Sequence, residues 1–496
     1  MRVVATLAMP STLLTTPIVV NSGMCDYSGM SNIEKVATHL NENFDKYLED
    51  LRTMVRIPSV SFQGFEASEV RRSAEAVAKL LKERGLENVR TLEIPGAHPY
   101  VYGERLKAPG KPTVLLYAHH DVQPPGREEL WKTPPFEPTM KEGPGGMRMF
   151  ARGAADDKAG IFVHTASIAS FLATVGELPV NVKVVIEGEE ECGSAHLSQF
   201  LNTYRKQLDA DILILTDAGN FDCGVPALTV ALRGMIGVQI EVRGLNKTVH
   251  SGMWGGPIPD PAMALNKILA RLVDDQGKIA IPGVREQMTP LTKAEEENLR
   301  KIPFNEAEFR LQSGMLPKTQ FLKEGPNPMG QVWRYPSLTV NAIQASSRKQ
   351  AGNIINDTAW ARFTIRLVAG MDPAKVQIQV EKFLKELTPW GLELEITFED
   401  GAPAWSVDPD AKHKPTFDLA RRALAKAYGK EVVMMGCGGS IPFVGPFAEA
   451  LGDAPALLIG VEDPYTNAHG ENESVLLSDL RKAVLSQIYL FDELAK

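Results

Sequence analysis

Short apolar runs alternate with helix-length amphipathic segments along the first half of the chain, and this alternation limits the possible folds more than any other feature. Some runs have the length and apolar character of buried strands: residues 114–118, 180–187 and 211–216. Segments with apolar residues at helical spacing surround them: residues 31–56, 71–84, 159–174 and 194–208. Strands that alternate with helices build a mostly parallel sheet flanked by helices on both faces, so we predict an α/β fold.

The hydrophobic pattern changes after about residue 228. Patterns typical of antiparallel strands follow, with helical segments among them: strands at 228–232, 238–242, 338–342, 359–368 and 392–398, and helices at 260–274 and 373–387. Residues 284–335 are polar, rich in proline and without clear periodicity, so we expect an insertion there. The α/β pattern then returns: helix 415–428, strand 456–461 and helix 474–494. We therefore predict a catalytic domain of residues 31–232 and 400–496, interrupted by an inserted α+β domain of residues 233–399.

Composition and charge exclude several classes of protein. Hydrophobic residues make up 44% and charged residues 23% of the 496 residues, which is typical of a globular protein and excludes a disordered chain. The net charge of −8 argues against nucleic-acid binding, because phosphate binding requires a basic surface. No window of about 18 apolar residues occurs, so we expect no membrane span.

The cysteines and the N-terminal segment bear on the cellular location. The 4 cysteines are widely spaced and form no C-x-x-C, which argues against a disulfide scaffold and a cysteine-rich zinc module and fits a reducing, cytoplasmic compartment. Pro10 and Pro17 interrupt the apolar stretch near the N-terminus, whereas an export signal needs a clean run of about 7–15 apolar residues. We expect residues 1–30 to be a disordered leader or absent from the mature protein, and export is the alternative.

Side chains that bind metals lie just beyond the predicted strands. His119 and Asp121 follow the first strand, and Asp156 lies in a glycine-rich turn before a helix. The remaining strand-end residues are the following: Glu190 and Glu191 after the second strand, Asp217 after the third, and His469 in the loop after the last. Because the carboxyl ends of parallel strands face one crevice, we expect these side chains to meet there.

Carboxylates that converge in one crevice repel each other unless cations lie between them. Because histidines join them, the mixed nitrogen and oxygen ligation suits Zn²⁺, with Mn²⁺ or Co²⁺ as alternatives. Five ligands with one bridging carboxylate would hold two ions about 3.5–4 Å apart. Two assignments stay open at this point: His120 competes with His119 as a ligand, and Glu189 extends the glutamate run by one position.

Several motifs, taken together, resemble one known family. They are Ala-His119-His120-Asp121-Val-Gln-Pro, Arg-Gly-Ala-Ala-Asp156-Asp157-Lys-Ala-Gly, Glu-Gly-Glu-Glu190-Glu191-Cys-Gly-Ser, Asp217, Val-His250-Ser-Gly-Met-Trp-Gly-Gly, Arg366-Leu-Val, Gly438-Gly439-Ser440-Ile-Pro and His469. The chain is similar to the M20 metallopeptidases, which are dinuclear-zinc dipeptidases, carboxypeptidases and amino-acid deacylases, and most of all to their carnosinase-like dipeptidase branch. The similarity extends from about Ser31 to the C-terminus. Ala118 departs from the pattern, because the family usually has glycine before the metal-binding histidine.

The resemblance implies a set of metal ligands. Asp156 would bridge two divalent ions. His119 and Asp217 would bind one ion, and Glu191 and His469 would bind the other. The spacing of the motifs favours His119 over its neighbour as the ligand of the first ion.

Further roles near the ions follow from the same resemblance. Glu190 would be the general base, and Asp121 would orient the imidazole of His119. The family often has a cis peptide bond after the bridging aspartate, so we expect one between Asp156 and Asp157.

The inserted domain and the loop at residues 438–440 would supply the substrate contacts. His250 would reach the oxyanion from the partner subunit, so the resemblance implies a homodimer formed through the inserted domain. Arg366 would bind the C-terminal carboxylate of the substrate with its planar guanidinium. Other contacts would come from Asn353, Gly438, Gly439 and Ser440.

The resemblance and the strand-end residues together predict a hydrolase, a metallopeptidase that cleaves the amide bond of a dipeptide or short peptide with a free C-terminal carboxylate. A water activated by the metal ions would lose its proton to Glu190 and attack the scissile carbonyl. The alternative is the removal of an acyl group from an N-acyl amino acid, although the insertion at residues 284–335 favours the dipeptidase. A non-catalytic binding protein is a third hypothesis, and the presence of Glu190 argues against it.

Overall fold

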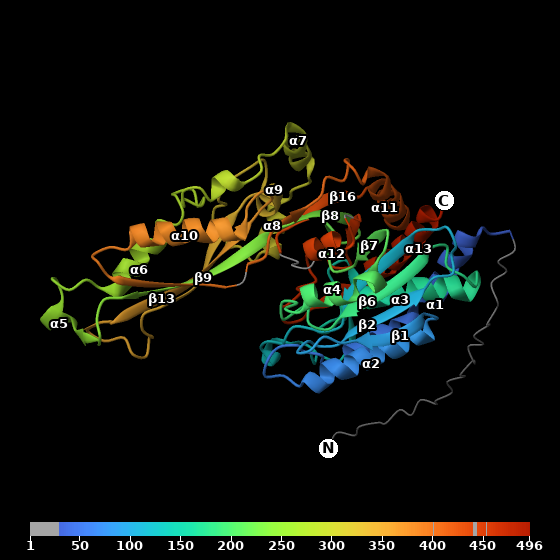
Figure 1. The fold of residues 1–496 in the computed structure, drawn as a ribbon, viewed down its shortest axis with the longest axis horizontal. Helices are drawn as coiled ribbons and strands as arrows, with labels where there is room; N and C mark the ends of the chain where they lie inside the picture. Colours follow the sequence, from blue (N-terminus) through green and yellow to red (C-terminus); the bar gives the residue numbers. More distant parts are fainter. Residues whose placement is uncertain (1–28, 400, 440–443, 453) are drawn as a thin grey trace, which may run out of the picture.

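The computed structural model describes residues 29–399, 401–439, 444–452 and 454–496, and a central sheet organises the larger of its two units (Figure 1). The leader predicted for residues 1–30 lies outside the described residues except for its last two. In spatial order the strands of this sheet are β1 (Glu87–Leu92), β2 (Tyr100–Arg105), β6 (Asn181–Glu187), β3 (Thr113–His119), β7 (Ile212–Leu215), β17 (Ala456–Ile459), β8 (Ala227–Leu232) and β15 (Trp405–Ser406), while β16 (Val433–Cys437) also pairs with β8.

The middle of the central sheet is parallel and buried on both faces. Strands β6, β3, β7 and β17 pair in parallel, and their apolar residues are almost completely buried. Towards both edges the pairing becomes antiparallel, between β1, β2 and β6 on one side and between β17, β8 and β15 on the other. The predicted α/β fold class is confirmed, while the strands β1 and β2 have no counterpart in the sequence prediction.

Helices cover both faces of the central sheet, as predicted. One face packs against α1 (Asn32–Val55), α2 (Ala67–Glu83), α3 (Lys158–Thr174), α11 (Lys414–Tyr428) and α13 (Leu477–Leu494), and the other against α4 (Leu197–Leu208) and α12 (Val444–Ala450). Ser31 and Glu34 form a capping box that begins α1. Helix α3 lies deepest, because every residue from Lys158 to Phe171 is buried. The N-terminus of this buried helix is therefore held rigidly against the sheet.

A second sheet, antiparallel throughout, forms a unit that projects from the first (Figure 1). Its strand order is β11 (Ser337–Gln344), β13 (Thr358–Leu367), β9 (Gly234–Arg243) and β14 (Glu393–Phe398). Helices α6 (Pro261–Leu269) and α10 (Pro373–Leu387) share an apolar core with this sheet. Buried residues alternate with partly exposed ones along β13, as in a sheet with one covered face. The strands and the helix 373–387 predicted in this region are confirmed, while the helix predicted at 260–274 ends earlier, at Leu269.

The segment 284–335 contains short helices that the sequence pattern does not predict. They are α7 (Lys293–Lys301), α8 (Glu306–Gln312) and α9 (Pro328–Arg334). Thr292, Asn305 and Asn327 cap them, so polar side chains rather than an apolar periodicity define where they begin. Helix α9 contacts β16, and its Trp333 packs against the ring of Phe221. The segment is therefore structured and lies against the central sheet.

The remaining elements are short. A small sheet contains β18 (Ser474–Leu476), β5 (Gly146–Phe150) and β4 (Thr139–Gly143), and 3-10 turns occur at Glu128–Leu130 and Arg285–Gln287. At the end of the second unit farthest from the central sheet, β10 (Val249–His250) pairs with β12 (Ile354–Ile355) and leads into α5 (Ser251–Trp254) (Figure 1). Of the helices in the described part of the chain, none has both the length and the apolar composition needed to cross a bilayer.

Candidate functional site

The structure brings all five proposed metal ligands together at the carboxyl edge of the parallel strands. Two groups of three can each hold an ion, because their ligand atoms lie within 4.8 Å of one another. The groups are His119, Asp156 and Asp217, which we call the His119 position, and Asp156, Glu191 and His469, which we call the His469 position. Asp156 belongs to both groups.

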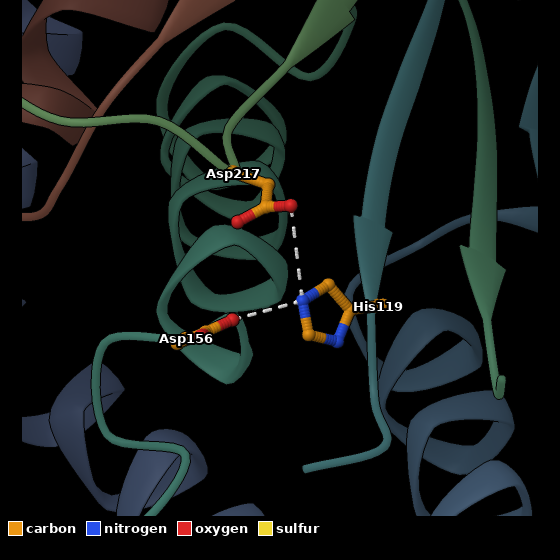
Figure 2. A group of neighbouring side chains, drawn as sticks. All are labelled: His119, Asp156 and Asp217. Carbon is orange, nitrogen blue, oxygen red and sulfur yellow. Dashed lines mark hydrogen bonds and ion pairs between the residues drawn. The ribbon is translucent and has the colours of Figure 1, made fainter. Parts of the chain in front are cut away.

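The His119 position is built directly on the central sheet (Figure 2). His119 is the last residue of β3, Asp217 lies just beyond β7, and Asp156 precedes the buried helix α3. The Nε2 atom of His119 lies 3.0 Å from Asp156 Oδ1 and 4.0 Å from Asp217 Oδ2, and Figure 2 shows both carboxylates directed at this ring. Strands β3 and β7 are neighbouring parallel strands whose last pair is Tyr117 with Leu215, so His119 and Asp217 each follow two residues later at the same edge of the sheet.

The His469 position combines the same aspartate with two loop residues. The Nε2 atom of His469 lies 3.1 Å from Asp156 Oδ2 and 3.4 Å from Glu191 Oε2. The two oxygens of Asp156 therefore face different histidines, which is the arrangement expected of a bridging carboxylate. The side chain of His469 is 60% exposed, and its backbone is left-handed with φ of 62°. This ligand is the least enclosed of the five.

Asp121 connects His119 with the glutamate loop. Its backbone oxygen lies 3.1 Å from His119 Nδ1, and its carboxylate lies 3.5 Å from the same nitrogen. This carboxylate also accepts hydrogen bonds from the backbone amides of Glu190 and Glu191 and from the hydroxyl of Ser61. A proton on Nδ1 leaves the Nε2 lone pair directed at the other ligands, as the predicted orienting role requires.

The two residues that competed with these assignments point elsewhere. His120 is buried and its Nε2 donates to the backbone oxygen of Pro99. Burial lowers the pKa of His120 to about 4, so it is neutral at physiological pH. Glu189 accepts hydrogen bonds from the hydroxyl of Tyr100 and from both the backbone and the ring of His196. Neither side chain takes part in the two metal-binding groups.

Gln123 and Ser61 also contact the site, although the sequence motifs predict no role for either. The backbone amide of Gln123 donates to Glu191 Oε1 at 3.1 Å, and its side-chain amide donates to Glu191 Oε2 at 2.7 Å. Gln123 holds the carboxylate of Glu191 in place through both bonds. Its position within the His119 motif, two residues after Asp121, was the available signal. Ser61 follows the Ile-Pro break after the first helix and offers no comparable signal.

The acidic side chains of the cluster raise one another's pKa. Burial raises the pKa of Glu190 and Glu191 well above the usual range, and the nearby Asp156 raises both further. Burial and Asp156 also raise the pKa of Asp217 to about 6. Buried carboxylates that raise each other's pKa are stabilised as anions by positive charge placed between them. The donor set of imidazole nitrogens and carboxylate oxygens fits divalent transition metals at both positions.

The loop that carries Asp156 is anchored to the N-terminus of α3. The Asp156–Asp157 peptide bond is cis, which confirms the expectation from the motif. The carboxylate of Asp157 accepts from the amide of Gly160 and from the backbone amide of His119. A Cβ at Gly160 would lie only 2.2 Å from Thr216 Oγ1, so glycine is required for α3 to approach the end of β7.

The residues predicted to bind the C-terminal carboxylate of the substrate lie where the two units join. Arg366 is on β13, opposite Met235 on β9 and Ser337 on β11, and burial lowers the pKa of its guanidinium. The backbone oxygen of Gly438 accepts from Arg233, and the amide of Gly439 donates to Cys437 Sγ. Arg233 lies next to Arg366, since the positive charge of Arg366 contributes to a lowered pKa of Arg233. Ser440 lies outside the described residues.

The structure does not bring His250 and Asn353 to the metal-binding groups of the same chain. Both are exposed, and the amide of Ser251 donates to the backbone oxygen of Asn353. His250 caps α5, which lies at the far end of the second unit (Figure 1). Any role of these residues at the metal site requires the site of another chain.

Curated relatives match almost the whole chain. A cysteinylglycine-S-conjugate dipeptidase of Corynebacterium striatum is 31% identical over 465 residues, which span 92% of this chain and 98% of that protein. The Cys-Gly metallodipeptidase DUG1 of Saccharomyces cerevisiae is 30% identical and spans 88% of this chain and 92% of its own length. The human Beta-Ala-His dipeptidase is 28% identical, with 89% of each chain covered.

Solved structures share the fold. The dipeptidase Dug1p from Saccharomyces cerevisiae and human carnosine dipeptidase 1 each match with a TM-score of 0.81 at 27% sequence identity, over 94% of this chain and 99% of theirs. Residues 115–490 match peptidase family M20/M25/M40. The resemblance predicted from the motifs is confirmed: the chain belongs to peptidase family M20/M25/M40 and is a hydrolytic metallopeptidase.

Proposed function

We propose that the protein is a dinuclear metallodipeptidase that cleaves the amide bond of a dipeptide or short peptide with a free C-terminal carboxylate. The observation that carries this proposal is the geometry of Asp156, whose two oxygens face His119 on one side and His469 on the other. The matched relatives are named as dipeptidases, which favours this activity over the deacylase alternative. A binding protein without turnover would have no need of Glu190 beside both groups of ligands.

Zn²⁺ is the ion that suits the donor set best, with Mn²⁺ or Co²⁺ as alternatives. His119, Asp156 and Asp217 would hold one ion, and Asp156, Glu191 and His469 would hold the other. When bound, divalent ions polarise the scissile carbonyl and lower the pKa of a water in the site towards about 7.

Glu190 is the group that we assign to proton transfer. Its carboxylate lies 3.9 Å from His119 Nε2 and belongs to neither group of metal ligands. From this place Glu190 takes the proton of the attacking water and later delivers it to the leaving amine. The hydrogen bond from its backbone amide to Asp121 fixes the loop from which the side chain projects.

Substrate recognition follows from charge. Arg366 offers a guanidinium that binds a carboxylate in a bidentate manner, and the neighbouring Arg233 adds positive charge at the same place. Gly438 and Gly439 line the adjacent loop, and the proposal extends to Ser440 and to Asn353 as polar contacts. A peptide whose C-terminus is bound here presents its last amide bond to the metal site.

We propose that the chain works as a homodimer in which residues 233–399 act as the lid and dimerisation domain of a catalytic domain made of residues 31–232 and 400–496. Strand β11 is an edge strand, and its apolar residues Val340 and Ile343 are exposed. An exposed apolar edge pairs readily with a second copy of itself. Dimerisation of this kind allows His250 of the partner subunit to stabilise the oxyanion at the metal site.

A cytoplasmic location is part of the same proposal. The cysteines in the described part of the chain, Cys192, Cys223 and Cys437, are free thiols. Free thiols are typical of a reducing compartment.

The metal content of two variant proteins tests whether His119 or His120 is the metal ligand. We expect His119→Ala to lower the metal content from about two ions to about one per chain, because it removes a ligand of one position. His120→Gln should retain both ions, because its side chain contacts Pro99 instead. Metal analysis of the dialysed proteins by mass spectrometry measures both values, and the reverse pattern would identify His120 as the ligand.

Glu190→Gln tests the general base. This variant should keep the fold and the metal ions but lose about 10²–10⁴-fold or more in kcat, the range that general acid–base groups contribute. Glu189→Gln is the matched control, since Glu189 bonds to Tyr100 and His196, and it should retain a kcat near that of the wild type. Steady-state kinetics on a dipeptide provide the comparison, and a fully active Glu190→Gln enzyme would contradict the assignment.

Arg366→Met tests the recognition of the C-terminal carboxylate. We expect kcat/KM for a dipeptide to fall about 10–100-fold, because hydrogen bonds to charged groups contribute about 1.5–3 kcal/mol. The preference of the enzyme for the dipeptide over the same dipeptide with a C-terminal amide should disappear. Arg362→Met, four residues earlier on β13, removes a guanidinium that pairs with Glu399 and should leave this preference intact. N-acetyl amino acids in the same assay decide the alternative, since their preferential hydrolysis would show a deacylase.

Mixed dimers test whether His250 serves the partner's site. His250→Ala and Glu190→Gln homodimers should both be nearly inactive, and His250→Ala should lower kcat far more than metal content. A mixed dimer purified through two affinity tags contains one complete site, so it should regain about half of the wild-type kcat. Inactive mixed dimers, or a monomer by light scattering, would contradict the partner role of His250.

A further inference from the structure

A buried ion pair connects the loops that carry Asp156 and His469. Arg152 is 1% exposed and Glu473 is 0% exposed, and Arg152 Nη1 donates to Glu473 Oε2 at 2.6 Å. Arg152 shortly precedes Asp156, and Glu473 shortly follows His469, although the pair is 321 positions apart in the sequence. No metal ligand is part of this pair.

The carboxylate of Glu473 also holds the backbone that leads into Asp156. Its Oε2 accepts from the amide of Gly153 at 3.1 Å, and its Oε1 accepts from the amides of Ala155 at 3.0 Å and Asp156 at 3.2 Å. Together with Arg152, these donors occupy the roughly four lone-pair positions of a carboxylate. Glu473 therefore has no acceptor capacity left for an ion, and its effect on the site passes through the backbone of Asp156.

The guanidinium of Arg152 reaches two further loops. Its Nη2 donates to the backbone oxygen of Gly470 at 3.1 Å and to that of Pro124 at 3.2 Å. Gly470 directly follows His469, and Pro124 directly follows the residue that binds the carboxylate of Glu191. Arg152 thus fixes the backbone directly beside His469. It reaches Asp156 through Glu473 and reaches Glu191 through Pro124 and the adjacent Gln123.

The two ion positions depend on different parts of the fold. In the His119 position, His119 and Asp217 closely follow the paired residues of the neighbouring strands β3 and β7, so the central sheet holds the chain close to both. In the His469 position, His469 is an exposed loop residue with a left-handed backbone, and it belongs to no strand. The Arg152–Glu473 pair supplies the connection that the sheet does not provide.

We propose that the Arg152–Glu473 ion pair is a positioning element that sets the affinity of the His469 position for its divalent ion. Both positions share Asp156, but the His469 position loses the support of the His469 loop as well, whereas the His119 position keeps His119 and Asp217 at the ends of β3 and β7. Loss of the pair therefore weakens the ion at the His469 position and leaves the ion at the His119 position in place. The inference rests on the proposed function in one respect, since it takes the two groups of ligands as two ion positions.

Glu473→Gln is the direct test, because it removes the charge opposite Arg152 and replaces one acceptor oxygen by a donor. Metal ions are removed from the full-length protein with a chelator, and the protein is then titrated with Co²⁺. Calorimetry and the absorption spectrum of the bound Co²⁺ measure each binding step. The wild type should show two binding steps. In Glu473→Gln one step should weaken about 10–100-fold, the usual effect of losing a group that orients metal ligands, while the other step keeps its affinity and spectrum. Saturating Co²⁺ should restore most of the lost kcat for a dipeptide.

Asp463→Asn is the matched control. Asp463 forms an equally buried ion pair with Arg148 at 2.9 Å, and Arg148 bonds to Ser474 rather than to the Asp156 loop or Gly470. This variant should lose thermal stability yet keep both binding steps. Arg152→Lys is a second variant, which retains the positive charge but loses the planar guanidinium that bonds to several partners at once. It should show the same selective weakening of one Co²⁺ step if Glu473→Gln fails to fold.

The outcomes separate the possibilities. Two unchanged Co²⁺ steps in both Glu473→Gln and Arg152→Lys, or an equal loss of both steps, would overturn the positioning role. Selective weakening of one step in a protein that hydrolyses no dipeptide would contradict the proposed function and still support the positioning role. A wild-type chain that binds a single Co²⁺ would overturn both.

Discussion

The mutual repulsion of buried carboxylates is the constraint on which this structure depends. Asp156, Glu190, Glu191 and Asp217 converge at one edge of the sheet, where burial and their shared charge raise the pKa of the last three. Such a cluster is stable as anions only when positive charge lies inside it. The imidazoles of His119 and His469 complete a mixed nitrogen and oxygen donor set of the kind that binds transition-metal ions. The chemistry of hydrolysis follows from that requirement.

The fold meets this constraint by two means. His119 and Asp217 each lie two residues beyond the last pair of the neighbouring strands β3 and β7, so the parallel centre of the sheet brings them to the same edge. Helix α3, buried on all sides from Lys158 to Phe171, begins directly after the Asp156 loop and anchors it. The remaining ligands lie on loops, where hydrogen bonds from Gln123 and the Arg152–Glu473 pair replace the missing strand framework.

The parts of the fold with long apolar runs could be predicted from the sequence, and so could the residues that follow those runs. The choice between His119 and His120 could not be made from the strand pattern, because adjacent residues face opposite sides of a sheet and the pattern does not say which side carries the site. Strand β1 is mostly exposed and so has no apolar run to reveal it. Helices α7 to α9 are short and begin at polar caps, and α9 packs against β16 while α7 packs against α9. The Arg152–Glu473 pair joins distant positions, and no local pattern marks such a contact.

The order of the ligands along the chain has a consequence for biosynthesis. His119, Asp156, Glu191 and Asp217 all precede the projecting unit, whereas His469 and Glu473 follow it. A ribosome must therefore complete the whole second sheet before the residues that close the site emerge. A nascent or prematurely terminated chain contains most of the acidic cluster but lacks its last imidazole, so the peptidase gains its hydrolytic capacity only at the end of translation.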